Sequence, residues 1–184
     1  MGKTLIYYFR DEFKVYISAR DHKKGRQVAS DLNVNYIESN EGLANISDIL
    51  VISVPIENTC DVIHEVAPFM KAGSLMVDVT SVKEGPSRTM AEALPDSVEY
   101  IPTHPVFGPR TTRLDNQVIV LTADKKGKWY PKAHCRFSAR RSLYGTLPYE
   151  ETSDGRKQAY RSYRWRNCYG WRPLGKNGYA FYDD

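Results

Sequence analysis

The chain has 184 residues, three cysteines and a formal net charge of +4. That length suffices for one domain with a substantial core, and three scattered cysteines do not make a disulfide framework. The first residues are too polar for a signal peptide, and no stretch approaches the roughly 18 apolar residues that span a bilayer. We therefore expect a soluble, cytoplasmic protein without a membrane partner.

Short runs of β-branched and aromatic residues recur along residues 1–131 and predict strands. The run Ile49–Val54 is apolar on both faces, which is typical of a central parallel strand with helices on each side. The predicted strands are Thr4–Tyr7, Phe13–Ser18, Val34–Ile37, Ile49–Val54, Leu75–Val79, Val98–Ile101 and Val118–Leu121.

Stretches with helical spacing lie between these runs. They cover Asp21–Leu32, Asn58–Ala67 and Pro86–Leu94, the last of which opens with a proline in its first turn. Alternating strands and helices predict an α/β fold with a doubly wound, mostly parallel sheet. We expect Ile49–Val54 and Leu75–Val79 at its centre.

The composition changes near Pro131. Residues 1–131 carry 15 Lys and Arg against 17 Asp and Glu, whereas residues 132–184 carry 11 against 5. Ile, Leu and Val number 32 in the first part and 3 in the second, which is too few for a core of its own. The expected organisation is an α/β domain over residues 1–131 and an irregular, basic, aromatic-rich tail over residues 132–184.

Four segments together resemble an archaeal-type prephenate dehydrogenase over residues 3–131. The Thr-Ser-Val-Lys and Thr-His-Pro-Val-Phe-Gly-Pro sequences are the specific part, and either alone would be weak. The four segments are Tyr16–Asp21, Ile52–Ile56, Asp78–Lys83 and Pro102–Pro109.

The resemblance implies that residues 1–131 form the Rossmann-like nucleotide-binding domain of an enzyme of tyrosine biosynthesis. Such an enzyme oxidises prephenate with NAD(P)+, releases CO2 and forms 4-hydroxyphenylpyruvate, with arogenate as the alternative substrate. It implies that His104 is the catalytic histidine, which accepts the hydroxyl proton as hydride leaves the same carbon. Ser81 would orient that histidine and approach the nicotinamide. Structural alternatives are a loop hydrogen bond for His104 and a helix cap for Ser81.

Cofactor preference follows from the end of the second predicted strand. In NAD-specific folds an acidic residue there accepts the ribose hydroxyls, but this strand ends Ser18-Ala19-Arg20. Arg20 can pair with a 2′-phosphate and Ser18 can donate a hydrogen bond to it, which favours NADP as the cofactor, with NAD still possible. The structural alternative is that Arg20 belongs to a solvated, basic helix start. The resemblance adds Ser53, Val54, Pro55 and Thr80 as cofactor contacts. No histidines or cysteines have metal-ligand spacing.

The chain departs from the family pattern at its start. The only glycine before Gly25 is Gly2, so no G-x-G-x-x-G motif is present. Five residues separate Thr4–Tyr7 from Phe13–Ser18, whereas a parallel crossover needs about a dozen. We therefore expect a defective first β–α unit, with Thr4–Tyr7 in a hairpin or detached, Tyr8–Asp11 left from the first helix, and no phosphate-binding turn.

The second departure lies in the tail. Residues 142–151 weakly resemble the end of a nucleotide domain, and nothing beyond them matches the helical domain that binds substrate and forms the dimer in this family. Three hypotheses remain: an impaired NADP-dependent dehydrogenase, a catalytically dead remnant of one, or a binder of nucleic acid or acidic partners. The last would use Arg161, Arg164 and Arg166 with neighbouring aromatic residues, and it lacks any recognised nucleic-acid motif.

Overall fold

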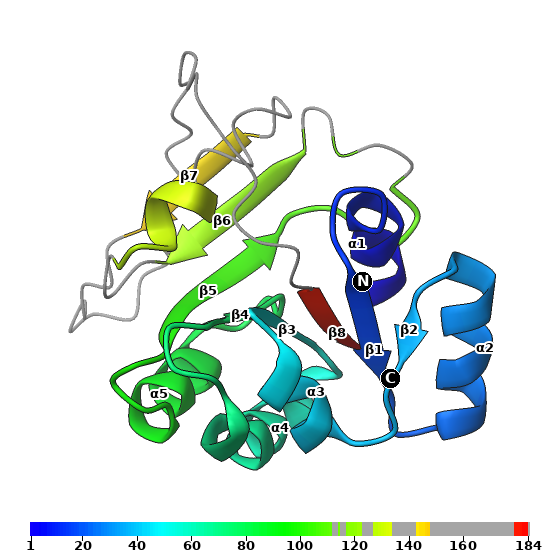
Figure 1. Ribbon diagram of the computed structural model, residues 1–184. Helices are drawn as coiled ribbons and strands as arrows, with labels where there is room; N and C mark the ends of the chain where they lie inside the picture. Colours follow the sequence, from blue (N-terminus) through cyan, green and yellow to red (C-terminus); the bar gives the residue numbers. More distant parts are fainter. Residues whose placement is uncertain (112–113, 115–116, 123–126, 134–142, 148–178, 184) are drawn as a thin grey trace.

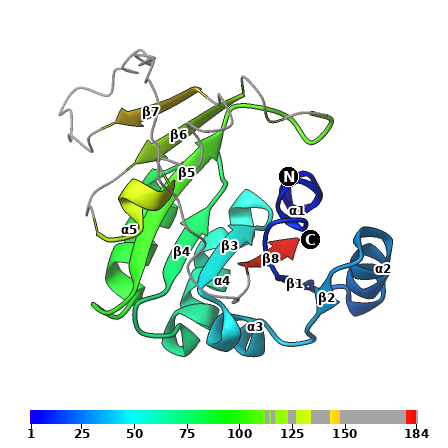
Figure 2. The ribbon, with the colours of Figure 1, turned by 45° about the horizontal axis from the view of Figure 1, so that its top comes forward.

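The computed structural model describes residues 1–111, 114, 117–122, 127–133, 143–147 and 179–183, the last two ranges as backbone alone. These residues form an eight-stranded sheet between two layers of helices (Figures 1 and 2). The order of the strands is β2-β1-β8-β3-β4-β5-β6-β7. Within the described ranges, each helix is too short or too polar to span a bilayer.

The strands are short and the helices between them have about two or three turns. The strands are β1 (Val15–Ser18), β2 (Asn35–Tyr36), β3 (Ile49–Ser53), β4 (Leu75–Asp78), β5 (Glu99–Pro105), β6 (Val118–Thr122), β7 (Leu143–Leu147) and β8 (Tyr179–Asp183). The α-helices are α1 (Gly2–Phe9), α2 (His22–Leu32), α3 (Asn40–Ile46), α4 (Thr59–Val66) and α5 (Glu84–Ala93). Two 3-10 turns, Ile56–Asn58 and Ala67–Phe69, flank α4.

The sheet is parallel apart from one pair. Only β5 and β6 run antiparallel among the described strand pairs, and β7 returns to a parallel pairing with β6. Strand β3 lies between β8 and β4, and β4 lies between β3 and β5. This confirms that the two most apolar predicted strands are central, and all five residues of β3 are buried.

Alternation along β3 divides the core into two clusters. Ile49 and Val51 pack on the face covered by α1 and α2, whereas Leu50 and Ile52 pack on the face covered by α3, α4 and α5. A strand with helices on both sides must be apolar at every position, which explains the continuous run seen in the sequence. The doubly wound α/β class is therefore confirmed.

The prediction of a strand at Thr4–Tyr7 is wrong, because these residues belong to helix α1. Gly2, Leu5, Ile6 and Phe9 follow the i, i+3, i+4, i+7 spacing of a helix face, and Leu5 and Ile6 join the core under the sheet. No hairpin forms with β1. The Thr4 hydroxyl donates to the Pro109 carbonyl at 2.9 Å, so the first turn of α1 lies beside the connection that follows β5.

Strand β8 was not expected from the sequence. It pairs in parallel with β1 on one side, where Val15 is opposite Tyr179, and with β3 on the other, where Ile49 is opposite Tyr179. The last described residues of the chain thus take a central place in the sheet (Figure 1). Strand β7 lies within residues 142–151, where the sequence weakly resembles the end of a nucleotide domain. The rest of the predicted irregular tail lies outside the described residues.

Helix α3 was also missed. Its N-cap is Ser39, whose hydroxyl accepts a hydrogen bond of 2.9 Å from the Gly42 N–H. The helix has only seven residues, of which Leu43 and Ala44 are buried. So short an apolar stripe is hard to separate from a loop by periodicity alone.

The double pairing of β8 leads to a stability prediction. Ala180 is opposite Tyr16 in β1 and Leu50 in β3, and Ala180→Pro removes its N–H from the middle of a sheet. We expect a loss of at least about 1 kcal/mol in the free energy of unfolding, the net value of one such hydrogen bond. The measurement is urea denaturation followed by circular dichroism.

Ala180→Ser is the matched control, because it keeps the backbone N–H with a side chain of similar size. We expect it to unfold close to the parent protein. Equal midpoints for the proline and serine variants would mean that β8 does not pair between β1 and β3.

Candidate functional site

The predicted site residues come from four segments that the topology brings to one edge of the sheet. Strands β1, β3, β4 and β5 run in the same direction, β1 and β3 being linked through β8. Their carboxyl ends therefore share an edge, which is where doubly wound sheets bind ligands. Arg20 follows β1, Val54 and Pro55 follow β3, Ser81 follows β4, and His104 lies near the end of β5.

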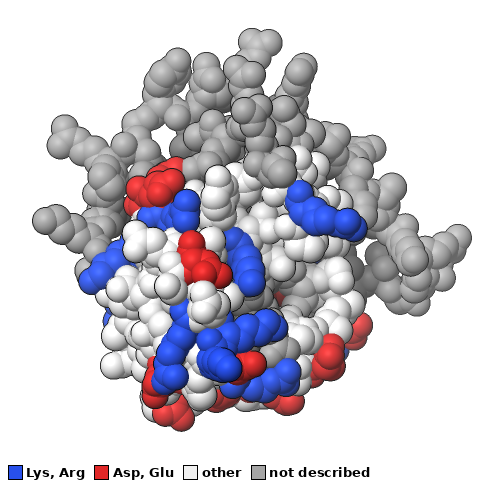
Figure 3. All heavy atoms as spheres, turned by 90° about the vertical axis from the view of Figure 1, so that its right-hand side faces the viewer, with Lys and Arg blue, Asp and Glu red and all other residues white. Residues whose placement is uncertain are grey.

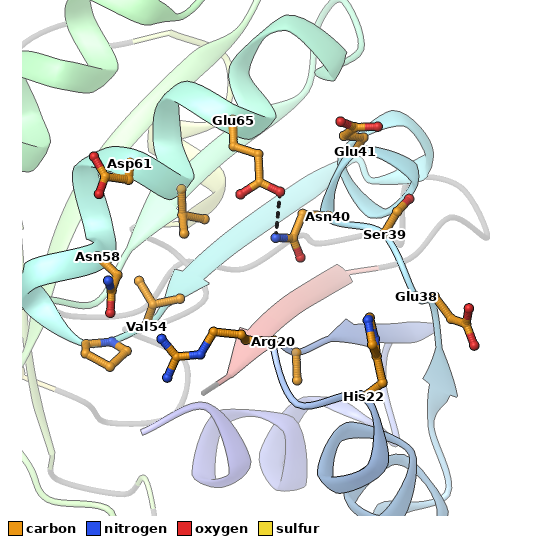
Figure 4. A pocket seen from close by; sticks show the side chains of 13 residues that line it. Arg20, His22, Glu38, Ser39, Asn40, Glu41, Val54, Asn58, Asp61 and Glu65 are labelled. Atoms are coloured by element: carbon orange, nitrogen blue, oxygen red, sulfur yellow. Dashed lines mark hydrogen bonds between the residues drawn. The ribbon is translucent and has the colours of Figure 1, made fainter.

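A cavity of about 460 Å³ opens at this edge between the ends of β1 and β3 (Figure 4). Three of the predicted cofactor contacts, Arg20, Val54 and Pro55, line it. In Figure 4 the Arg20 side chain extends from the β1–α2 connection toward Val54. Other polar lining residues are His22, Glu38, Ser39, Asn40, Glu41, Asn58, Asp61 and Glu65.

One wall of the cavity depends on a close approach of α2 to β2. A Cβ on Gly25 would lie 2.6 Å from the Tyr36 ring and 3.0 Å from the Ala19 Cβ, so only glycine allows this packing. The Tyr36 hydroxyl and His22 Nδ1 share a hydrogen bond of 2.7 Å. Asp21 caps α2, and the hydrogen bond from the Lys24 N–H lowers the pKa of this carboxyl.

The opposite wall carries acidic side chains. Glu65 on α4 accepts a hydrogen bond of 2.9 Å from the Asn40 side-chain amide (Figure 4). Glu38 pairs with Arg26 of α2 at the rim. The cavity therefore presents a cationic side at Arg20 and carboxylates at Asp61 and Glu65, a combination suited to a ligand with both phosphate and hydroxyl or amino groups.

The other predicted cofactor contacts are buried beneath this edge. Ser18 is 1% exposed, and its hydroxyl has no hydrogen-bond partner among the described residues. Ser53 and Thr80 are also buried. These three side chains lie in or directly after β1, β3 and β4, and none of them lines the cavity.

A second polar cluster lies at the end of β4 and centres on Asp78, whose side chain is fully buried. One carboxylate oxygen accepts from the Thr103 N–H at 3.1 Å, and the other accepts from the Thr80 N–H at 3.1 Å and from the Lys83 ammonium. A buried carboxylate is tolerated only when it is paired and hydrogen-bonded in this way.

Lys83 connects this cluster to β5. Its ammonium also donates to the Thr103 carbonyl at 2.6 Å, and the Thr103 hydroxyl donates to the Asp78 carbonyl at 2.6 Å. Thr103 thus directs its N–H, its carbonyl and its hydroxyl into the segment that begins at Asp78. The next residue along β5 is His104.

His104 is half-buried and sits opposite Val120 of β6. Burial lowers the pKa of His104, the nearby Lys83 charge lowers it further, and Asp78 opposes both effects. Burial likewise lowers the pKa of Lys83, against the attraction of Asp78. A histidine with a lowered pKa is neutral at physiological pH and can accept a proton.

Ser81 is exposed in the connection between β4 and α5. Strands β4 and β5 are neighbours, with Asp78 opposite Pro102. Ser81 comes three residues after Asp78, and His104 comes two residues after Pro102. Their convergence on one substrate stays a prediction. Among the described residues, no three His, Cys, Asp or Glu side chains are grouped as metal ligands.

Asp78 and Lys83 were not predicted as site residues, although both lie in the segment that carries the resemblance. The available signal was an acidic residue at the end of an apolar strand, followed five residues later by a lysine. A charge at that position is a candidate for a buried pair, because the carboxyl end of a central strand is covered.

Comparison with known proteins identifies the family. Residues 7–133 match the family model described as "Prephenate dehydrogenase, nucleotide-binding domain". A probable arogenate/prephenate dehydrogenase of Methanocaldococcus jannaschii is 41% identical over 138 residues, which cover 73% of this chain. The same alignment covers 31% of that relative, so the chain spans about a third of its length.

Solved structures share the fold at low sequence identity. The prephenate dehydrogenase of Aquifex aeolicus has a TM-score of 0.65 at 16% identity, over 80% of this chain and 57% of that one. Its complex with hydroxyphenyl propionate and NAD+ has a TM-score of 0.61. An imine reductase of Myxococcus stipitatus in complex with NADP+ has a TM-score of 0.61 at 14% identity, over 80% of this chain and 52% of that one.

The family match over residues 7–133 includes the residues that line the cavity and the Asp78–Lys83–His104 cluster. The chain therefore belongs to the prephenate dehydrogenase family, of which it contains the nucleotide-binding domain.

Proposed function

We propose that this chain binds a nicotinamide cofactor and contributes the proton-accepting histidine of a prephenate or arogenate dehydrogenase. The observation that carries the proposal is His104, a half-buried histidine of lowered pKa at the same sheet edge as the cavity. Ligands of doubly wound sheets bind at that edge. An impaired enzyme and a catalytically dead remnant are both compatible with this assignment.

The residues present fit one end of a dinucleotide. Val54 and Pro55 offer an apolar surface for a ring, Arg20 offers a cation for a phosphate, and Asp61 and Glu65 offer acceptors for hydroxyl or amino groups. When bound, a nicotinamide cofactor accepts the hydride from the ring carbon of the substrate. His104 would take the proton of the hydroxyl on that carbon, and Ser81 would orient the imidazole.

NADP is the cofactor that we infer. Strand β1 ends at Ser18 and is followed by Ala19 and Arg20, so no carboxylate stands where NAD-specific folds have one. Helix α2 begins directly beyond, with exposed Lys23 and Lys24. Figure 3 shows Lys and Arg side chains gathered on this side of the molecule, with acidic residues around them.

A substitution at Arg20 tests the cofactor preference. We expect Arg20→Ala to weaken NADP+ binding by about tenfold or more, the value of a hydrogen-bonded charge, and to leave NAD+ binding nearly unchanged. Isothermal titration calorimetry with both dinucleotides measures this.

Arg88→Ala is the matched control, because Arg88 is exposed on α5 and pairs with Glu84 rather than lining the cavity. Equal effects on NADP+ and NAD+ binding in Arg20→Ala would mean that Arg20 does not recognise the 2′-phosphate. An absence of heat with either dinucleotide in the parent protein would refute the proposed function.

The chain on its own is expected to turn over prephenate or arogenate slowly. No described residue can be assigned to the substrate carboxylates, and most of the rate of such enzymes depends on positioning. We expect turnover well below the common enzyme range of about 1 per second. The measurement follows reduced cofactor with saturating NADP+ and either substrate.

His104→Ala separates weak catalysis from background. Loss of a small turnover in this variant supports the impaired enzyme, and cofactor binding without any turnover supports the remnant. Turnover of about 1 per second or more would show that the positioning argument is wrong. The nucleic-acid hypothesis involves residues outside the described ranges.

A further inference from the structure

Every polar group of Thr103 is committed to the segment that follows β4. Its N–H donates to the Asp78 carboxylate, its hydroxyl donates to the Asp78 carbonyl, and its carbonyl accepts from Lys83. The backbone at residue 103 therefore cannot shift without breaking bonds to a buried charge. His104, the next residue, is paired on its other side with Val120 of β6.

Lys83 adds a third contact between this segment and β5, beside the two hydrogen bonds that join Thr103 directly to Asp78. Asp78 and Thr80 are two residues apart, and their hydrogen bonds form a turn at the end of β4. The Lys83 ammonium spans from that turn to β5, with 20% of its side chain exposed. The ammonium forms an ion pair with Asp78 and donates a hydrogen bond to the Thr103 carbonyl.

We propose that Lys83, held by Asp78, is a positioning residue for His104: it fixes the backbone from which the imidazole projects and places a positive charge beside it. The role in catalysis rests on the proposed function, whereas the placement of the charge does not. Lys83 touches neither substrate nor cofactor in this proposal, and it acts through His104.

The electrostatics agree with this role. Lys83 lowers the pKa of His104 in addition to the larger effect of burial, and Asp78 acts in the opposite direction. On β6, the residues opposite this part of β5 are Ile119, Val120 and Leu121, which carry no charge. The charges that act on the imidazole therefore come from the β4–α5 side. A neutral imidazole can accept the hydroxyl proton, and a protonated one cannot.

The test is a pH titration of His104 by NMR on the whole chain labelled in histidine, with the resonance assigned by His104→Gln. The variants are Lys83→Met, which keeps the length and removes the charge, and Lys83→Arg, which keeps the charge. We expect the His104 midpoint to rise in Lys83→Met, because a positive charge is lost and Asp78 is left unopposed. Lys83→Arg should restore a midpoint close to that of the parent protein.

The chain offers a matched control at the opposite edge of the sheet. The Lys71 ammonium donates to Asp48 at 2.6 Å and to the Ile46 carbonyl at 3.0 Å, which is the same kind of contact. Lys71→Met should destabilise the fold without moving the His104 midpoint. An equal shift in Lys71→Met and Lys83→Met would overturn the proposal, because it would reflect loosened structure alone.

Two further results keep the proposal falsifiable if Lys83→Met fails to fold. A parent midpoint at or above the ordinary histidine value of about 6.5 would overturn it. An unchanged midpoint in Lys83→Gln would also overturn it, if that variant, which removes the charge but keeps a polar side chain, stays folded. The titration uses neither cofactor nor substrate. A Lys83-dependent midpoint without NADP+ binding would thus support the positioning and refute the proposed function.

Discussion

The pairing of β8 with both β1 and β3 is the constraint on which the site depends. An interior strand forms hydrogen bonds along both of its backbone edges, and β8 is the described strand that joins β1 and β2 to the rest of the sheet. It also sets the spacing at the carboxyl edge, because two strand separations amount to about 9.6 Å. The cavity lies between the ends of β1 and β3, whose last residues, Ser18 and Ser53, face Tyr182 and Asp183 of β8. Without that spacing the Arg20 side and the Val54 side would not face each other across a ligand-sized space.

The same arrangement changes how a cofactor would be held. In a doubly wound nucleotide fold, the central strand turns through glycines into a helix whose first N–H groups meet the pyrophosphate. Here the place between β1 and β3 is taken by β8, and α1 precedes β1 in the chain. Arg20, Val54 and Pro55 line the cavity from the connections after β1 and β3. We therefore assign the preference for NADP over NAD to Arg20, whose side chain lies on the connection after β1.

The predictable part of the fold was the part with local periodicity. The apolar runs of β3 and β4 and the stripe of α4 are visible in the sequence because burial on one or both faces dictates each residue. The first helix was misread because four residues, Thr4–Tyr7, satisfy a β-propensity pattern, while the helical stripe emerges only over the eight residues of α1. Strand β8 could not be predicted from the sequence, for another reason. Its place is decided by an open position between β1 and β3, more than a hundred residues away, and parallel pairing leaves no local signature.

The site shows the same division between local and tertiary information. The resemblance to the family implies catalytic roles for His104 and Ser81. Asp78 and Lys83 belong to one of the resembling segments, but the resemblance implies no role for them. Their roles become visible once β4 and β5 are known to be neighbours, since only then does a lysine five residues after Asp78 reach the Thr103 carbonyl. A buried carboxylate needs a cation and hydrogen bonds to be tolerated. Here Lys83 supplies the cation, and the N–H groups of Thr80 and of Thr103, the residue before the histidine, donate to the carboxylate. The pair that stabilises the end of β4 therefore also determines where the imidazole points and which charge it faces, so the stability and the chemistry of this edge cannot be changed independently.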